Sequence, residues 1–475
     1  MSRKKKKNVI INDLKIESIG QEGVAVARKD ELVHFVTGAV PGDTVDARLT
    51  GRKRNLRYAD TETITDPSPD RIDPVCRHFG PCGGCKWQNL SYEKQLYWKS
   101  QIVKDAFERI GKVPVGQYEQ IMPAEEQYYY RNKMDFSFGA SRWMTNEEIK
   151  NQEEIEQKHF ALGLHIPGRF DKVLDIERCH IQNDEGNEIL NIMREKALEL
   201  ETRPYHDRFH DGFLRNLVIR SSRSTGEIMV VVITTTPETE DDLRFMDWLK
   251  NEAPDELPMA SDIIHSVNDA ISPNVYGKSE IIKGTGYITE NILGIEFRIS
   301  PFSFFQTNSA QLNKFIAEII DFAELKDDEI LWDLYCGTGS IALPASSKVK
   351  EVYGMEMMKT AVADARENME LNEIKNAEFF AADLHDKDIP SLFSRIPKPD
   401  VMTIDPPRAG MHKRLAGHIL EIASPRLVYV SCNPVTQARD CSLLAEKYDV
   451  VKVKPVDMFP HTSHVESIAL LELRQ

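Results

Sequence analysis

The sequence predicts an α/β protein in three parts: a small β-barrel, a mixed α+β central domain and a doubly wound, Rossmann-like C-terminal domain. Three observations support this prediction. Five strand-like runs lie within about 55 residues near the start, three clustered cysteines follow the barrel, and apolar strands alternate with helical segments from about residue 326. A chain of 475 residues also exceeds one hydrophobic core. We expect the domains to span residues 1–65, 66–300 and 301–475.

The barrel prediction rests on short runs of strand-forming residues that turn residues separate. Five such strands are typical of a Greek-key barrel of the oligonucleotide-binding kind. The proline-rich stretch Asp66–Asp70 then indicates a linker. The expected strands are Val9–Ile19, Gly23–Ala27, Leu32–Val36, Thr44–Thr50 and Tyr58–Ile64.

The formal charge of −15, at first sight, argues against a nucleic-acid partner. Residues 1–100, however, hold 18 Lys and Arg against 13 Asp and Glu, a net of +5, so the remainder carries −20. Basic side chains collect in Arg3–Lys7 and at Arg52, Lys53, Arg54 and Arg57. The distribution is compatible with a local basic face that contacts phosphates.

No apolar run of about 18 residues exists, so we expect no membrane span. The basic start, Met1–Lys7, lacks a following apolar stretch, and a cytoplasmic location is therefore expected.

Four of the seven cysteines suggest a metal site. Cys76, Cys82 and Cys85 form a C-x5-C-x2-C group with glycines around it, and Cys179 follows far downstream. In a cytosolic chain this grouping favours metal ligation over disulfides. A 4Fe-4S cluster and a tetrahedral zinc ion both suit four thiolates. The spacing slightly favours iron–sulfur, because zinc ribbons usually show two C-x2-C knuckles.

The rest of the central region combines helix and strand patterns. A helix is expected over Tyr92–Ile110 and strands over Lys133–Phe138, Leu217–Arg220 and Ile228–Thr234. The acidic segment Asn146–Lys158 indicates a surface insertion.

The C-terminal part places polar residues at the ends of successive apolar strands. Ile330–Leu334 leads through Tyr335 into a glycine turn, and Glu356 ends the next strand. Asp383 and Asp405 end two more. A nucleotide-like cofactor bound at this edge is expected, with Glu356 on ribose hydroxyls. Because Gly337, Gly339 and Ala342 also fit a dinucleotide fingerprint, the turn leaves a nicotinamide or flavin cofactor and S-adenosylmethionine open.

A further strand delivers Cys432 to the same edge, and Glu466 precedes the last strand. A thiolate, a carboxylate and a methyl donor suit methylation of uracil at carbon 5. Thiolate addition at carbon 6 makes carbon 5 nucleophilic, and a general base then removes the carbon 5 proton. Cys432 is the expected nucleophile, Glu466 the expected base, and Asp405 would hold the donor or the substrate in line. The nucleotide must leave its stack to react.

At this point the sequence resembles the RNA uracil-C5 methyltransferase family, and within it the iron–sulfur, TRAM-domain branch that modifies bacterial 23S ribosomal RNA. The resemblance covers nearly the whole chain. The motifs that carry it are Val36–Asp43, Gly83-Gly84-Cys85, Ser303–Asn308, Asp333–Gly339, Asp405-Pro406-Pro407-Arg408, Ser431-Cys432-Asn433-Pro434 and Phe459–Glu466.

The resemblance implies a 4Fe-4S cluster on Cys76, Cys82, Cys85 and Cys179. It implies S-adenosylmethionine contacts from Gln306, Tyr335, Glu356 and Asp405, with Cys432 as nucleophile and Glu466 as proton acceptor. Tyr335 stands where Phe is frequent in the family. The expected substrate is 23S ribosomal RNA before full ribosome assembly, and a monomer is expected. Tyr128–Lys133, Phe304 and Phe305 have two alternative roles. They could stack on RNA bases or hold phosphates, or they could pack in the protein core.

An amino-group methyltransferase shares an Asp-Pro-Pro-aromatic motif, but it needs no cysteine, and Arg408 replaces the aromatic residue that would hold an amine. Two further rival functions follow from the same features. One is a uracil-C5 methyltransferase acting on tRNA, although the tRNA group typically lacks both barrel and cluster. The other is a non-catalytic RNA-binding iron–sulfur assembly factor, against which Cys432, Glu466 and the strand-end residues speak. The sequence names neither the uridine nor the role of the cluster.

Overall fold

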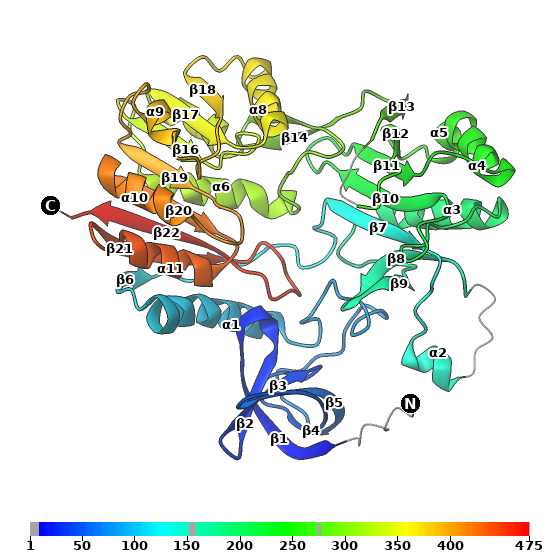
Figure 1. Cartoon of the computed structure of the whole chain (residues 1–475). Helices are drawn as coiled ribbons and strands as arrows, with labels where there is room; N and C mark the ends of the chain where they lie inside the picture. The colour runs from blue at the N-terminus through cyan, green and yellow to red at the C-terminus, as the bar shows by residue number, and fades with distance from the viewer. Residues whose placement is uncertain (1–8, 152–157, 273–276, 475) are drawn as a thin grey trace.

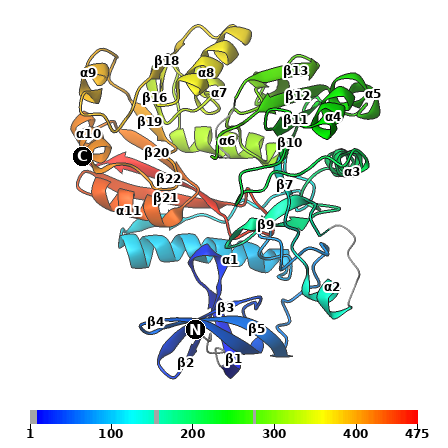
Figure 2. The same ribbon diagram turned by 45° about the vertical axis from the view of Figure 1, so that its right-hand side comes forward.

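The computed structural model describes residues 9–151, 158–272 and 277–474. In Figure 1 the barrel lies below two sheet-based units, and helix α1 (Tyr92–Asp105) lies between the barrel and the sheets. Figure 2 shows the same arrangement from a second direction. Among the described residues, no helix combines the length and apolar character that crossing a bilayer requires.

The predicted barrel is confirmed. Its five strands close in the order β1-β2-β3-β5-β4. Alternate residues point inward, so Leu14, Ile16, Val45 and Ala47 fill the interior. The strands are β1 Ile10–Ile19, β2 Ala25–Lys29, β3 Leu32–Thr37, β4 Thr44–Lys53 and β5 Leu56–Asp66.

The central region forms a seven-stranded sheet in the order β13-β12-β11-β10-β7-β8-β9, in line with the expected mixed α+β character. Strand β11 is buried along its whole length, which matches its unbroken apolar sequence. The strands are β7 Lys133–Gly139, β8 Ala161–Ile166, β9 Arg169–Asp175, β10 Leu214–Ser221, β11 Ile228–Thr234, β12 Asp262–Val267 and β13 Ser279–Lys283. The helices are α2 Asn146–Lys150, α3 Asp184–Glu199, α4 Glu240–Asn251 and α5 Ala253–Glu256. Residues 152–157 of the expected acidic insertion lie outside the described residues.

The C-terminal region contains the predicted doubly wound sheet, with eight strands in the order β18-β17-β16-β19-β20-β22-β21-β6. Strands β16 to β20 run parallel, whereas β22 pairs antiparallel to β20. The strands are β6 Val115–Tyr118, β16 Ile330–Leu334, β17 Glu351–Glu356, β18 Ala377–Ala381, β19 Val401–Ile404, β20 Arg426–Ser431, β21 Tyr448–Val456 and β22 Glu466–Leu473.

Helices cover this sheet, and α6 (Ser309–Ala323) shows how an apolar stripe does so. In α6 the buried residues Leu312, Phe315, Ile316 and Ile319 follow helical spacing. The others are α7 Ala342–Ala345, α8 Lys359–Leu371, α9 Ile389–Phe393, α10 Lys413–Ile422 and α11 Pro434–Leu444. A two-stranded sheet, β14 Ile288–Ile292 with β15 Ile295–Ile299, precedes them.

Two segments differ from the expectation. The helix from Tyr92 ends in a π-helical turn at Ala106–Gly111, which packs against α11. Strand β6, within the segment assigned to the central domain, pairs with β21 and so extends the C-terminal sheet. The chain therefore contributes one strand to the C-terminal sheet before it forms the central sheet. The domain limits given above remain a prediction.

Candidate active site

The parallel strands bring the expected cofactor residues to one edge of the sheet. Tyr335 follows β16, Glu356 ends β17, Asp405 follows β19 and Cys432 follows β20. Neighbouring strands are in register, with Leu334 opposite both Met355 and Ile404, so their carboxyl ends meet. The order of strands reverses between β16 and β19, and ligands of such sheets bind at that switch point. The backbone of Tyr335 adopts φ 63°, which turns the chain sharply out of the strand.

Buried carboxyl groups lie beneath this edge. Burial raises the pKa of Asp405 to about 7, and the neighbouring Asp333 adds to the effect. Burial likewise raises the pKa of Asp333 to about 7. One Asp333 oxygen accepts a hydrogen bond from the Thr403 hydroxyl (2.6 Å), while the other is buried without a partner in the described structure. A cationic ligand at this edge would lower the cost of ionising both groups.

In the part of the chain that the structure describes, the other three expected cofactor residues form hydrogen bonds with different neighbours and not with one another. The Tyr335 hydroxyl lies 3.2 Å from His385 Nε2, and Glu356 accepts a hydrogen bond from the Met358 backbone N–H (2.8 Å). Gln306 lies on the segment before α6, where its backbone carbonyl accepts a hydrogen bond from Asn132. Tyr335, Glu356 and Gln306 are each only partly buried, as a residue that contacts a bound ligand would be.

Cys432 and Glu466 are brought together by the antiparallel pairing of β20 with β22. Ser431 lies opposite Ser467, so Cys432 and Glu466 are the next positions on the two chains. Residues opposed in this way have Cβ atoms about 4.5–5.5 Å apart in regular pairing. Both side chains line one cavity of about 460 Å³. The expected nucleophile and base therefore face the same space.

The electrostatics of the pair follow from this burial. Glu466 is 5% exposed, and burial raises its pKa to about 8, with the Asp405 charge adding to the shift. Burial and then the Glu466 carboxylate raise the pKa of the Cys432 thiol to about 12. Arg408, in the same cavity, opposes both shifts. Burial lowers the pKa of the nearby His464 to about 4, so its ring is neutral near pH 7.

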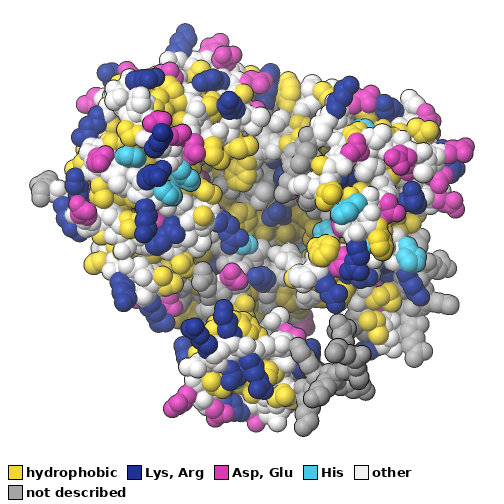
Figure 3. All heavy atoms as spheres, in the orientation of Figure 1, with side chains coloured by type: hydrophobic (Ala, Val, Ile, Leu, Met, Phe, Trp, Pro, Cys, Tyr) yellow, Lys and Arg dark blue, Asp and Glu magenta, His cyan; other side chains and the backbone are white. Residues whose placement is uncertain are grey.

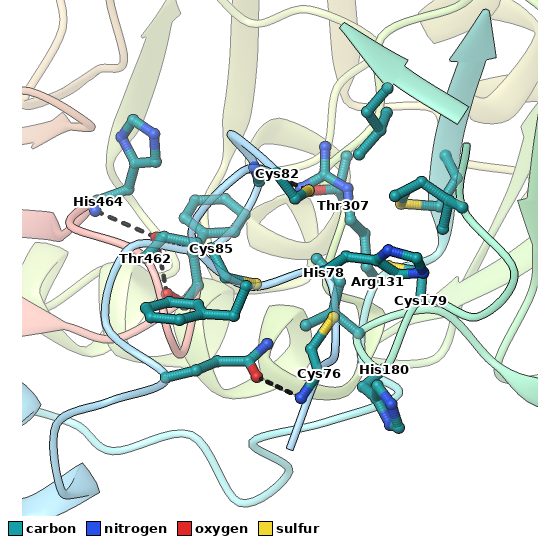
Figure 4. Close-up of a pocket in the computed structure, with 18 of the residues that line it drawn as sticks. Cys76, His78, Cys82, Cys85, Arg131, Cys179, His180, Thr307, Thr462 and His464 are labelled. Carbon is teal, nitrogen blue, oxygen red and sulfur yellow. Dashed lines mark hydrogen bonds between the residues drawn. The ribbon is translucent and has the colours of Figure 1, made fainter. Parts of the chain in front are cut away.

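The four grouped cysteines line this same cavity, as Figure 4 shows. All four are free thiols. Burial raises the pKa of Cys82 to about 11 and that of Cys85 to about 12, and the other cysteines of the group add to both shifts. Across residues 9–151, 158–272 and 277–474, however, no three His, Cys, Asp or Glu side chains are arranged to hold a metal ion. The cysteines meet at one cavity without forming a ready-made metal site.

The loop before Glu466 is held by a buried polar cluster that the sequence did not indicate. Lys99, fully buried in α1, forms an ion pair with the equally buried Asp457 (2.6 Å) and donates to the Phe459 carbonyl (2.9 Å). Gln95 accepts from the His461 backbone N–H (2.9 Å). The sequence does contain a signal for this buried face, because Gln95, Lys99 and Val103 recur at helical spacing. Two of the three are polar, however, so the face does not look like a buried one in the sequence.

This loop is also bound to the cysteine segment. The carbonyl of His461 accepts hydrogen bonds from the backbone N–H groups of Lys86 and Trp87, directly after Cys85. His461 itself has φ 64° and is almost fully buried. The position of the expected base therefore depends on the fold of the cysteine segment.

The aromatic residues considered for RNA contact divide into two groups. Tyr130 is 3% exposed and donates to the Pro460 carbonyl (3.0 Å), and Phe305 packs against Phe297, so both serve the core. Tyr129 and Phe304 are 43% and 73% exposed and stay available. Arg131 lines the same cavity as Cys432 and Glu466.

Known proteins resemble this chain over nearly its whole length. A family model described as tRNA (Uracil-5-)-methyltransferase matches residues 275–474. A Bacteroides thetaiotaomicron protein described as an RNA methyltransferase is 43% identical, covering 95% of this chain and 99% of its own. A Porphyromonas gingivalis relative with the same description is 41% identical, covering 96% and 99%. The crystal structure of Pyrococcus abyssi tRNA (uracil-54, C5)-methyltransferase with S-adenosyl-L-homocysteine aligns with a TM-score of 0.74 and 28% identity, covering 97% of this chain and 99% of its own.

Proposed function

This chain belongs to the RNA uracil-5-methyltransferase family and is an S-adenosylmethionine-dependent RNA methyltransferase, and we propose that it methylates carbon 5 of a uridine in 23S ribosomal RNA through a covalent Cys432 adduct. The observation that carries the proposal is the pairing of Cys432 with Glu466 at one cavity beside the cofactor edge. A thiol and a buried carboxyl in that relation suit addition to a pyrimidine followed by proton removal.

The reaction runs in four steps. Cys432 gives its proton to solvent water, and its thiolate adds to carbon 6 of the uracil, which pushes the electron pair of the ring double bond toward carbon 5. Gln306, Tyr335, Glu356 and Asp405 would hold S-adenosylmethionine, which would supply the methyl group that carbon 5 takes and would leave as S-adenosylhomocysteine. Glu466, as carboxylate, then accepts the carbon 5 proton. The carbon 6–sulfur bond breaks, which restores the ring double bond and releases Cys432.

Of the arginines that line the cavity, Arg408 is the one whose charge acts on both Cys432 and Glu466. It lines the cavity with Cys432 and Glu466 and opposes the rise of both pKa values. A guanidinium there favours the thiolate that attacks and the carboxylate that accepts the proton. Its backbone carbonyl accepts hydrogen bonds from Asn433 Nδ2 (3.0 Å) and the Thr436 hydroxyl (3.3 Å), which tie it to the nucleophile loop.

A 4Fe-4S cluster on Cys76, Cys82, Cys85 and Cys179 is part of the proposal. Four free thiols at one cavity are the donor set that such a cluster takes, and the Gly84 backbone N–H approaches Cys82 Sγ at 3.4 Å, as in sulfur ligands that backbone amides stabilise. When bound, the cluster would hold the 76–85 loop to the segment of Cys179. No step of methyl transfer passes through it.

The choice of 23S ribosomal RNA rests on the resemblance of the cysteine and barrel motifs. Exposed Arg52, Lys53 and Arg54 on the β4–β5 hairpin suit a TRAM-type role of the barrel in RNA binding. We place the protein in the cytoplasm as a monomer that acts before full ribosome assembly. The second candidate substrate is tRNA, since the Pyrococcus abyssi enzyme named for tRNA covers 97% of this chain, barrel included. A barrel therefore does not separate the two.

Mapping of 5-methyluridine in 23S ribosomal RNA and in tRNA from cells with and without the gene tests the proposal. Loss of one 5-methyluridine in 23S RNA alone supports it. Loss in tRNA alone replaces the substrate while keeping the chemistry, and no loss in either RNA overturns the proposal.

A further inference from the structure

A second cavity, of about 670 Å³, lies beside the active one in the central unit. Strands β7, β8 and β10 supply its floor, and the β8–β9 turn and the 205–210 segment supply its walls. Ligand pockets for molecules of nucleotide size fall in this range of volume. Figure 3, in the orientation of Figure 1, shows hydrophobic, histidine and Lys or Arg side chains gathered over the region of β8 and β9, beside the hollow between the two units.

The two cavities adjoin along the seven-stranded sheet. Asp135 lines the active cavity and accepts a hydrogen bond from Asn216 Nδ2 (3.2 Å), which lines the second. Asp135 and Ser137 point to the same face of β7, and Ser137 lies opposite Asn216 in the neighbouring strand. Two residues along a strand span about 7 Å. An RNA strand whose uridine occupies the cavity of Cys432 and Glu466 would therefore reach the second cavity within about the length of one nucleotide.

The rim of the second cavity carries an exposed aromatic ring beside a cation. Phe170 is 67% exposed. The guanidinium of its neighbour Arg169 is exposed and has no ion pair or hydrogen bond within the described part of the chain, whereas Arg208 is paired with Asp171 (2.9 Å). An aromatic face for a base and a free cation for its phosphate are the two elements of single-strand binding.

The wall chemistry tells which part of a nucleotide enters. Asp207 lines the cavity, and a carboxylate repels a phosphate but accepts hydrogen bonds from the amino and imino groups of a base. His165 and Asn216, also in the lining, offer further polar groups to base edges. The other cation of the lining, Arg215, is 5% exposed and donates to the backbone carbonyls of Asn268 and Ala270, so the exposed Arg169 at the rim is the one left for the phosphate.

Three apolar side chains are exposed here as well, since Phe170, Phe209 and Ile271 are 67%, 71% and 70% exposed. The polar groups of the lining, which match base edges, favour a nucleotide over a protein partner as the occupant.

We propose that this cavity holds an unpaired nucleotide of the substrate RNA, close in sequence to the methylated uridine, with its base on Phe170 and its phosphate on Arg169. The inference rests on the proposed RNA methyltransferase function. It gives the enzyme a second point of recognition that the chemistry at Cys432 does not use.

Steady-state kinetics on unmethylated total RNA from cells lacking the gene test the proposal. Phe170→Ala and Arg169→Ala are each expected to raise KM for RNA roughly 5- to 100-fold, with kcat at saturating RNA and KM for S-adenosylmethionine unchanged. Phe170→Trp keeps a stacking face and is expected to retain the wild-type KM. The control is Leu243→Ala, since Leu243 on α4 is 59% exposed and lines neither cavity.

Photo-crosslinking separates the two levels of the proposal. Wild-type protein with 4-thiouridine-substituted RNA is expected to give a crosslinked peptide that contains residues 165–171. If the wild-type enzyme methylates RNA and both Phe170→Ala and Arg169→Ala keep the wild-type KM for RNA, the proposed nucleotide site is overturned. Crosslinks that lie only outside residues 165–171 overturn it as well. In either case the methyltransferase function still stands. A wild-type enzyme that methylates no RNA overturns the function itself.

Discussion

Glu466→Gln is expected to stabilise the fold in alkaline solution while it removes activity. The carboxyl of Glu466 is 5% exposed, and burial raises its pKa from 4.5 to about 8. The folded protein therefore pays to ionise this group, by roughly 5 kcal/mol at pH values above 8, since each pH unit corresponds to about 1.4 kcal/mol. Glutamine fills the same space without a charge.

The sign of the effect follows from proton binding. Below pH 4.5 the carboxyl is protonated in both states and costs nothing. Between pH 4.5 and 8 the folded state binds more protons than the unfolded state, so stability falls as pH rises, and above 8 the full cost is present. Glu466→Gln removes this fall of stability with rising pH, because glutamine does not ionise. The variant should gain about 4 kcal/mol over wild type between pH 5 and pH 9.

Urea unfolding at pH 5 and pH 9 measures this difference. At pH 9 the midpoint of the variant is expected to lie on the order of 1 M above that of wild type, and at pH 5 the two should nearly coincide. Glu472→Gln is the matched control, because Glu472 lies on the same strand but is exposed. Equal midpoints of variant and wild type at both pH values would refute the reasoning about burial.

Three further predictions concern the support of the site. Lys99→Met should lower the free energy of unfolding by roughly 3–5 kcal/mol, because it leaves Asp457 charged and buried, and Lys99→Met with Asp457→Asn should recover part of the loss in urea unfolding. Gln95→Leu should lower kcat roughly 10- to 100-fold with KM for S-adenosylmethionine unchanged, because it releases His461 and shifts the Glu466 loop; an unchanged kcat would exclude this positioning role. Anaerobically purified protein should contain about four iron and about four sulfide per chain by chemical analysis, and stoichiometric zinc would contradict the cluster.

The strand-end residues could be predicted because parallel strands follow a simple rule. Once Tyr335, Glu356, Asp405 and Cys432 are each placed after an apolar strand, their meeting at one edge follows from the sheet alone. The closed barrel was predictable for a similar reason, since its strands are consecutive and local turns separate them.

The contacts between distant segments were not predictable in this way. Lys99 and Asp457 are 358 positions apart, and no local pattern announces that a lysine in a helix will be fully buried. The pairing of Cys432 with Glu466 needs the antiparallel register of β22, which hydrophobic periodicity does not reveal. The second cavity joins side chains from four separate stretches of the central unit and exists only in the folded chain.

The covalent adduct is the most direct test of the account. RNA carrying 5-fluorouridine should bind the wild-type enzyme covalently after methyl transfer, because Glu466 cannot remove fluorine as a proton. Digestion and mass spectrometry should then place the methylated fluorouridine on the peptide that contains Cys432, and Cys432→Ala should form no adduct while it still binds S-adenosylmethionine. A wild-type enzyme that methylates uridine in the same RNA but forms no adduct with the fluorinated RNA, or an adduct on another cysteine, would contradict the account.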